Sequence, residues 1–264
     1  MCIRDSGADT WHDDLGTTGD GVKIGIIDSN FAEIDTLFGT ELPPEDEIEF
    51  YCGSGSEDFN NCINGDNVHG TWVSQIVHDV APDADLYISN SQNSVGDMIA
   101  SGVDVITMSL GYAWVGPGDG TSEYSPNSIL DVIDTAIEGG AVWVNSAGNY
   151  NEGSWLGDWT DDDNDGWHEW NSNADGFAST SVPDANETTR LKASSGNFAT
   201  HLRWEGDWGG EDTDLDIVLT DSDNNILNTY GDEQDGDSSD KPYDHKCMNA
   251  NLSLIHISEP TRPY

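Results

Sequence analysis

Short apolar segments alternate with segments of helical periodicity over the first 150 residues of the chain. Residues 22–28 (VKIGIID) form an apolar run that ends in an acid, which is typical of a buried parallel strand. Apolar residues at helical spacing predict a helix over His69–Val80 that ends before Pro82. The alternation continues with strands expected at 84–90, 103–110 and 141–145 and helices expected at 95–101 and 129–138. This order predicts an α/β domain with a parallel sheet flanked by helices.

The pattern changes after residue 150. Residues 155–176 are rich in Trp, Asp and Gly and have no helical period. Three alternating stretches follow, at 198–204, 215–220 and 226–230. Asp223-Asn224-Asn225 between the last two is favourable for a hairpin turn. We therefore expect residues 151–251 to form a mostly β module.

The two ends of the chain can be explained by a single coding oligonucleotide. MCIRDS at residues 1–6 and LSLIHISEPTR at residues 252–262 can be encoded by the two strands of one oligonucleotide. They resemble translated sequencing-library adaptor, whereas a natural start and tail is the weaker alternative. Residues 1–6 and 252–264 are therefore excluded from the fold prediction as artefacts.

Charge narrows the possible functions. The chain has 51 acidic and 8 basic side chains, a formal net charge of -43 and a pI near 4.1. This balance excludes a basic surface for nucleic acid and disfavours anionic membranes. No apolar run is long enough to span a bilayer, so no membrane insertion is expected. Ten Trp residues and clear apolar segments argue against disorder. The acidic surface is typical of proteins that work in concentrated salt, where repulsion is screened.

Three polar elements lie where an α/β sheet collects functional groups, at strand ends and helix starts. Asp28 follows the first predicted strand, and His69 begins a predicted helix with Gly70 behind it. The turn Ser146-Ala147-Gly148-Asn149 follows another buried strand and can present an amide. Each has a simpler structural explanation, since Asp and His often serve as helix caps or turn formers.

In this order, the three elements resemble the subtilisin-like serine peptidases. The matching stretches are IGIIDSN, HGTWVSQIVHDVAPDADLY, VITMSLG and AVWVNSAGN, within residues 20–150. The resemblance implies that residues 7–150 are the N-terminal part of a catalytic domain, with an incomplete subtilisin-like sheet. It also implies that Asp28 orients and stabilises the imidazolium, that His69 is the general base and acid, and that Asn149 donates to the oxyanion.

The resemblance also implies substrate-binding residues. Ser109, Leu110, Gly111, Ala147 and Gly148 match segments that pair with the substrate backbone and line the specificity pocket. The partner would be a protein or peptide, and no organic cofactor would be needed.

The chain departs from the family pattern in several places. Asn30 stands where Gly is usual, Trp72 replaces a second His, and Ser74-Gln75 replace small residues. The Gly-Thr-Ser-Met-Ala of the nucleophile does not follow the Asn149 turn, and Gly120-Thr121-Ser122 precedes it. The catalytic Ser is therefore expected beyond residue 251, and the chain as written is expected to be inactive.

The β module would then be an insertion between the Asn and Ser blocks. Residues 201–227 resemble the jelly-roll β-sandwich domains attached to secreted peptidases. Both a binding role and an inert spacer stay open.

A calcium loop is one interpretation of Asp161, Asp163 and Asp165-Gly166, because closely spaced carboxylates offer hard oxygen ligands. Position twelve of such a loop is Ser172 rather than Glu, so a solvated acidic loop stays an equal alternative.

Cys52 and Cys62 lie in a Gly-, Ser- and Asn-rich loop without further ligands at metal spacing. A disulfide between them is favoured over zinc and over free thiols, and it predicts an oxidising, extracellular location.

The sequence therefore predicts part of a secreted, acid-rich subtilisin-like serine endopeptidase that acts through an acyl-enzyme. The alternative is a catalytically inactive relative that serves as a surface-binding or adhesive module. Trp72 and the large insertion are the features that favour the alternative.

Overall fold

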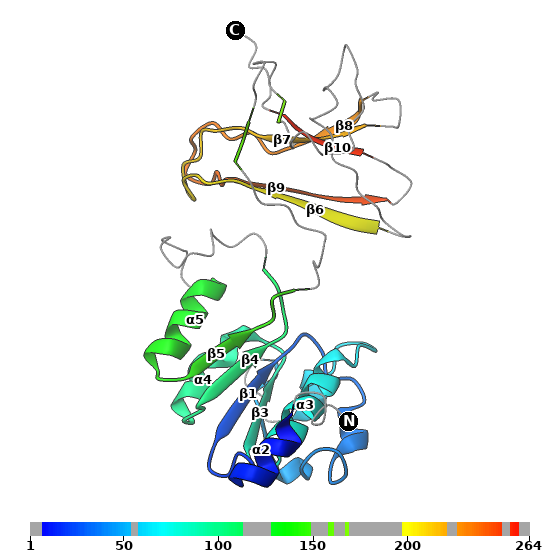
Figure 1. Cartoon of the computed structure of the whole chain (residues 1–264), viewed down its shortest axis with the longest axis vertical. Coiled ribbons are helices and arrows are strands. Elements are labelled where there is room, and N and C mark those ends of the chain that lie inside the picture. The colour runs from blue at the N-terminus through cyan, green and yellow to red at the C-terminus, as the bar shows by residue number, and fades with distance from the viewer. Residues whose placement is uncertain are drawn as a thin grey trace. The chain divides into compact units, whose positions relative to one another are not determined.

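The computed structural model describes residues 7–53, 58–112, 128–148, 158–160, 167–168, 197–220, 226–249 and 254–258. The chain divides into two compact units (Figure 1). The first, the α/β unit, comprises residues 1–115 and 124–150, and the second, the β unit, comprises residues 116–123 and 151–264.

The α/β unit contains a five-stranded sheet in the order β2-β3-β1-β4-β5. All neighbouring strands are parallel, as the alternation of apolar and helical segments predicts. The predicted α/β fold class is confirmed. The strands are β1 (Lys23–Ile27), β2 (Ile48–Phe50), β3 (Asp85–Ser89), β4 (Val105–Met108) and β5 (Val142–Asn145).

Helices cover both faces of this sheet (Figure 1). On one face, α4 and α5 enclose an apolar layer that includes Met98 and Ile106. On the other, α3 packs Val73 and Val77 against a layer that includes Ile26. The helices are α2 (Ala8–Leu15), α3 (His69–Val80), α4 (Val95–Ala100) and α5 (Ile129–Glu138), with short 3-10 turns η1 (Ile34–Leu37), η2 (Glu45–Glu47), η3 (Phe59–Cys62) and η4 (Gln92–Ser94).

One glycine sets the distance between β1 and α4. A Cβ on Gly25 would lie 2.9 Å from the Met98 sulfur and 3.3 Å from side-chain carbons of Val103 and Ile106. Because these neighbours are themselves packed in the core, the strand needs a residue without a side chain here. Gly25 therefore allows the helix layer to approach the sheet closely.

Two elements of the α/β unit were not predicted from the sequence. Strand β2 has only three residues, of which Ile48 and Phe50 are buried and Glu49 is exposed. Such a short alternation does not stand out from a loop. Helix α2 has only eight residues, and its three apolar residues, Ala8, Trp11 and Leu15, are too few to stand out as a helical face.

The β unit contains two antiparallel sheets, one in the order β10-β7-β8 and one that pairs β6 with β9. Strands β7 and β8 are neighbours, as a hairpin requires, and the predicted turn at 223–225 lies outside the described residues. Strand β9 was not predicted. The strands are β6 (Asn197–Arg203), β7 (Asp216–Thr220), β8 (Ile226–Tyr230), β9 (Tyr243–Asn249) and β10 (Leu254–Ser258).

Strand β10 lies within the tail that the fold prediction excludes. Its five residues pair with β7 in antiparallel register, from Leu254 opposite Thr220 to Ser258 opposite Asp216. The sequence LIHIS is rich in β-branched residues, so it has high strand propensity whatever the origin of its codons. The adaptor origin of residues 252–264 stays a prediction, since strand propensity does not depend on the origin of the codons.

No helix in the described ranges has the length and hydropathy of a membrane span.

We predict that Gly25→Val lowers the free energy of unfolding by about 1–3 kcal/mol, because the added side chain overpacks the layer under α4. Gly96→Ala is the matched control, because Gly96 is exposed on α4 and a Cβ there meets nothing within 4 Å. Urea denaturation followed by circular dichroism measures both. An equal free energy of unfolding for Gly25→Val and wild type would contradict the packing described here.

Candidate active site

The end of β1 and the start of α3 bring Asp28 and His69 together. The imidazole Nδ1 of His69 lies 2.7 Å from the Asp28 carboxylate oxygen Oδ2. The Asp28 side chain is fully buried, whereas the His69 side chain is 50% exposed. A carboxylate only accepts hydrogen bonds, so Nδ1 carries the proton and donates it. The second nitrogen, Nε2, is then left to act on a group outside the pair.

Backbone contacts hold Asp28 at the sheet edge. Its amide donates to the Ser89 carbonyl of β3 at 3.1 Å, which continues the parallel ladder by one residue. The Ser29 amide donates to carboxylate oxygen Oδ1 at 2.8 Å. Both oxygens of this buried carboxylate therefore have a donor, which offsets the cost of removing the charge from water.

The first turn of α3 packs directly on the Asp28 loop. The Gly70 amide donates to the Asn30 carbonyl at 3.0 Å, and the His69 amide donates to Asn67 Oδ1 at 2.9 Å. A Cβ on Gly70 would lie 2.6 Å from the Asn30 oxygen and 2.8 Å from the Asp28 Cβ. Glycine is required after His69 because the helix could not otherwise bring the imidazole to the carboxylate.

Asn30 connects the Asp28 loop to the loop before α3. Its side chain is 3% exposed and bonds both backbone groups of Asn64. The Asn64 backbone amide donates to Asn30 Oδ1 at 2.9 Å. The Asn30 side-chain nitrogen Nδ2 donates to the Asn64 backbone carbonyl. The Asn30 side chain thus fills the position where the family pattern has a glycine and fixes the approach to α3.

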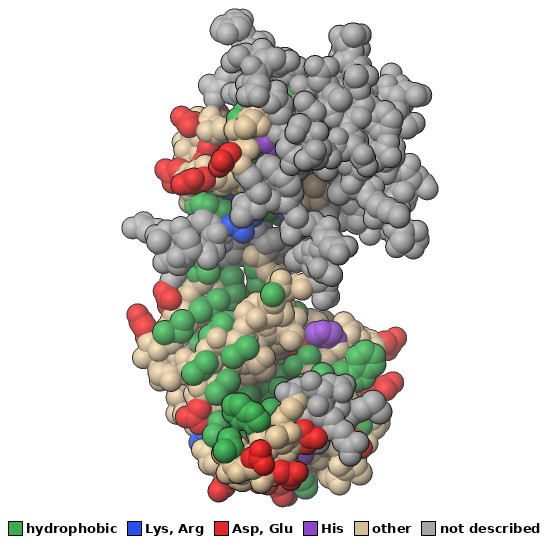
Figure 2. Space-filling view, viewed as in Figure 1, with side chains coloured by type: hydrophobic (Ala, Val, Ile, Leu, Met, Phe, Trp, Pro, Cys, Tyr) green, Lys and Arg blue, Asp and Glu red, His purple; other side chains and the backbone are tan. Residues whose placement is uncertain are grey.

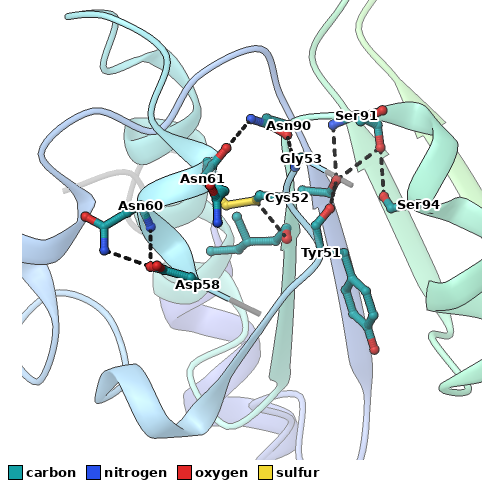
Figure 3. Close-up of a disulfide and its surroundings, with 12 residues drawn as sticks. Tyr51, Cys52, Gly53, Asp58, Asn60, Asn61, Asn90, Ser91 and Ser94 are labelled. Atoms are coloured by element: carbon teal, nitrogen blue, oxygen red, sulfur yellow. Dashed lines mark hydrogen bonds between the residues drawn. A yellow bond between two sulfur atoms is a disulfide. The ribbon is translucent and has the colours of Figure 1, made fainter. Parts of the chain in front are cut away.

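A disulfide between Cys52 and Cys62 anchors the neighbouring loop (Figure 3). Both cysteines are fully buried, and their Cα atoms are 5.0 Å apart. The Cys62 carbonyl accepts a hydrogen bond from the Phe31 amide at 3.2 Å, three residues after Asp28. This hydrogen bond therefore connects the disulfide to the loop that carries the Asp28 carboxylate.

Asn90 connects the two sides of this disulfide loop (Figure 3). Its side-chain amide donates to the Asn61 carbonyl at 2.7 Å, and its Oδ1 accepts from the Gly53 amide at 3.2 Å. Asn90 follows β3, so the loop is attached to the same sheet edge as Asp28.

The predicted substrate-binding residues lie at the carboxyl ends of two adjacent strands. Ser109, Leu110 and Gly111 follow β4, and Ala147 and Gly148 follow β5. The two strands are parallel neighbours, with Met108 opposite Asn145. Both segments therefore begin at the carboxyl-end edge of the sheet, where β4 is the neighbour of β1 and β5 follows β4.

Asn145 is a residue of this region that sequence reasoning missed. Its side-chain amide donates to the Leu110 carbonyl at 3.1 Å and to the Ser146 carbonyl at 3.0 Å. It thereby ties the segment after β4 to the segment after β5. Its position at the last residue of a strand, before the predicted turn, was the available signal.

Several predicted site residues lie outside the described residues. They are Asn149 and the three carboxylates of the candidate calcium loop, Asp161, Asp163 and Asp165. Among the residues that are described, no three or more His, Cys, Asp or Glu side chains are grouped as metal ligands.

An apolar stripe extends from His69 along one side of α3. Trp72, Ile76 and Val80 share this face because residues three or four apart are neighbours on a helix, and they are 61%, 46% and 43% exposed. Figure 2 shows hydrophobic side chains exposed over the α/β unit. The His69 imidazole thus lies at one end of an exposed apolar stripe.

The face of β5 that lies on the α3 side of the sheet is also uncovered. Val142 and Val144 are 59% and 48% exposed. They follow in register from Val105 and Thr107 of β4 and from Ile24 and Ile26 of β1, which α3 covers. Helix α3 therefore covers only part of this face of the sheet.

The sequence comparison decides the family. Residues 19–205, more than half of the chain, match the model of the Subtilase family. The chain belongs to the subtilase family. The resemblance identified from the residues around Asp28 and His69 is confirmed, and the match continues beyond residue 150 into the segment expected to be an inserted module.

Among solved structures, 26 chains are similar to this subtilase. One is described as the "Structure of the Clostridium Perfringens CspB protease", with 12% sequence identity and a TM-score of 0.42. The match covers 99% of this chain and 65% of that one, so this chain spans about 65% of the length of that protease. No curated protein matches the sequence significantly.

Two departures of this subtilase from the family pattern have local explanations. Ser74 is fully buried and donates to the Gly70 carbonyl at 2.8 Å, within its own helix. Trp72 lies on the exposed stripe, away from Asp28. Neither residue intervenes between the Asp28 carboxylate and the His69 imidazole.

We predict that the double variant Cys52→Ala/Cys62→Ala has a free energy of unfolding about 2–4 kcal/mol lower than wild type, because the disulfide restricts the unfolded chain. Cys247→Ala is the control, since Cys247 is free and exposed, and it should change little. Denaturant unfolding measures both variants. Non-reducing peptide mapping should find Cys52 and Cys62 in one cross-linked fragment, and alkylation of both without reductant would contradict this.

We predict that Asn30→Ala lowers the free energy of unfolding by about 1–3 kcal/mol, because a buried side chain loses two hydrogen bonds. Asn60→Ala removes an exposed amide that bonds Asp58, and it should cost no more than about 0.5 kcal/mol. Chemical denaturation compares the two. Equal losses would show that Asn30 has no special role in the loop.

Proposed function

We propose that this chain is part of a secreted serine endopeptidase that cleaves peptide bonds through an acyl-enzyme. The observation that carries the proposal is the hydrogen bond from a half-exposed imidazole to a fully buried carboxylate, His69 to Asp28. A carboxylate that fixes the tautomer of a histidine is the arrangement that activates a serine hydroxyl.

The two residues would act in sequence. The neutral imidazole of His69 takes the proton of a serine hydroxyl at Nε2 while the serine attacks the scissile carbonyl. Asp28 then stabilises the imidazolium through the 2.7 Å contact at Nδ1. The same Nε2 proton is given to the leaving amine, and a water molecule later repeats the cycle to release the acyl group.

The substrate would be an extended peptide. Residues 109–111 and 147–148 follow adjacent parallel strands, which supports the proposal that their backbones accept a peptide by strand addition. Main-chain hydrogen bonds bind a peptide without demanding one sequence. Asn149, four positions after the last residue of β5 in the sequence, would donate to the oxyanion, and the loss of such a donor costs about 10²–10³ in turnover.

The serine is proposed to come from a segment beyond residue 251. Within the described ranges, His69 Nε2 has no hydrogen-bond partner. Exposed apolar residues extend from His69 along α3, and others lie on β5, and such surfaces favour the packing of a further element. A segment that packs there would bring its own side chains next to Nε2.

Secretion is supported by the chemistry of Cys52 and Cys62, because disulfides persist in oxidising compartments outside the cytosol. Calcium binding by Asp161, Asp163 and Asp165 remains a proposal alongside a solvated loop.

The proposal predicts labelling by a fluorophosphonate, which reacts with activated serines. The chain as printed should not be labelled and should not cleave casein above background. A version that continues through the gene past residue 251 should be labelled, and the label should disappear in His69→Ala. Asp28→Asn should reduce turnover by about 10⁴-fold, as in a Ser-His-Asp triad.

His12→Ala is the matched control, because the His12 ring contacts only the Val80 carbonyl at the far end of α3. It should leave labelling unchanged. A longer chain without a reactive serine would support the inactive surface-binding relative instead. Labelling of Ser122 in the chain as printed, abolished by His69→Ala, would show that the nucleophile is misplaced.

We also propose that the fold is adapted to concentrated salt. A net charge of -43 makes compaction costly in dilute buffer, and the Debye length falls from about 30 Å at 0.01 M to about 3 Å at 1 M salt. The thermal midpoint of the longer chain, followed by circular dichroism, should rise between these two salt concentrations. Equal midpoints would contradict the proposal.

A further inference from the structure

Two carboxylates of the β unit converge at Gly231, which follows β8. A Cβ added to Gly231 would lie 2.9 Å from Asp244 Oδ2 and still closer to Asp216 Oδ1. Asp216 is the first residue of β7 and Asp244 lies in β9, so the two come from different sheets. Because Gly231 has no side chain, Asp216 Oδ1 occupies the position that a Cβ would take, and Asp244 Oδ2 borders it.

Buried oxygens without a donor lie beside this position. Asp244 is 3% exposed, and its Oδ2 has no hydrogen-bond partner. Its Oδ1 accepts from the Asp232 amide at 3.1 Å, so only Oδ2 is unused. Gln234 is also 3% exposed, its Oε1 is unpartnered, and its amide group lies close enough to hydrogen-bond the Asp244 carboxyl. Unpartnered buried acceptors are costly, and here they lie beside one another.

No positive side chain balances these carboxylates. Among the residues described, no Lys, Arg or His forms an ion pair with Asp216 or Asp244. The arrangement is therefore short of positive charge.

A cavity lies next to these residues. It has a volume of about 600 Å³, and Gly231, Asp232 and Asp244 are among its lining residues. Asp244 Oδ2, which is itself buried, therefore lies close to an open cavity.

We propose that Asp216, Asp244 and the side-chain oxygen of Gln234 bind one hard divalent cation, calcium or magnesium. Carboxylate and amide oxygens are the ligands that these ions prefer, and both ions accept water in the remaining positions. The site has two carboxylates rather than three, so it differs from clusters of three or more acidic side chains. It also differs from the candidate loop at residues 161–165. The ion would join β7 to β9 and thus fix one sheet of the β unit to the other.

Calorimetric titration of the full chain tests the site, after removal of metal with EDTA and at one fixed salt concentration. Calcium and magnesium chloride are the probes. Wild type should bind one ion that Asp244→Asn does not bind. Removal of a residue that only supports a metal ligand typically lowers the affinity for the metal by about 10–100-fold. Asp244 would be a direct ligand, so Asp244→Asn should lower the affinity by at least as much.

Gly231→Ala tests the same arrangement without changing any charge, because its methyl group would displace Asp216 Oδ1 and crowd Asp244 Oδ2. It should weaken binding as Asp244→Asn does. Glu233→Gln is the matched control, since it removes one exposed carboxylate from the same segment and should leave the affinity unchanged. Asp163→Asn removes one carboxylate of the candidate calcium loop. The difference in ion affinity between wild type and Asp244→Asn should be the same with and without this substitution.

Thermal unfolding guards against misfolded variants. In EDTA, Asp244→Asn should be at least as stable as wild type, because a buried like-charge contact is removed. With calcium, the midpoint of wild type should rise and that of Asp244→Asn should not. Equal ion binding by wild type, Asp244→Asn and Gly231→Ala would overturn the proposal, and so would the absence of binding by wild type. Failure here leaves the peptidase proposal untouched, because Asp216 and Asp244 lie in the other unit.

Discussion

The carboxylate of Asp28 is a fully buried charge, and the surrounding architecture keeps it paired. An uncompensated buried charge of this kind costs about 3–5 kcal/mol. The imidazole of His69 can pair with it only if α3 begins close to β1, and Gly70 permits that approach. Asn30 and the disulfide hold the loops on either side. The same contacts that stabilise the charge therefore orient the histidine that would act as base.

The regular part of the fold could be predicted from the sequence because local pattern and tertiary packing agree there. Helix α3 begins and ends where its apolar spacing and Pro82 indicate. Strand β1 is an apolar run that becomes a central strand of the sheet. Strand β2 was missed because three residues carry too little pattern. Strand β10 was not predicted because residues 252–264 were left out of the fold prediction.

Site residues could be predicted only where both the residue type and its position relative to a strand or helix indicate a functional group. Asp28 at a strand end and His69 at a helix start carry that signal, and the structure brings them together. Contacts between distant loops carry none, since nothing local to Asn30 indicates Asn64 as its partner. The same holds for Asp216 and Asp244, which lie on different sheets and meet only because Gly231 leaves room. In a chain with 51 acidic residues, the sequence does not distinguish two carboxylates that meet from the many that do not.

The proposed role of the Asp28–His69 pair depends on which imidazole nitrogen of His69 carries the proton. Nitrogen NMR of the ring, recorded on labelled protein at a pH where the imidazole is neutral, measures this directly. We predict the Nδ1–H tautomer, with a downfield proton from the hydrogen bond to Asp28 that is lost in Asp28→Asn. A ring protonated at Nε2, with no downfield proton at Nδ1, would contradict the proposed role of the pair.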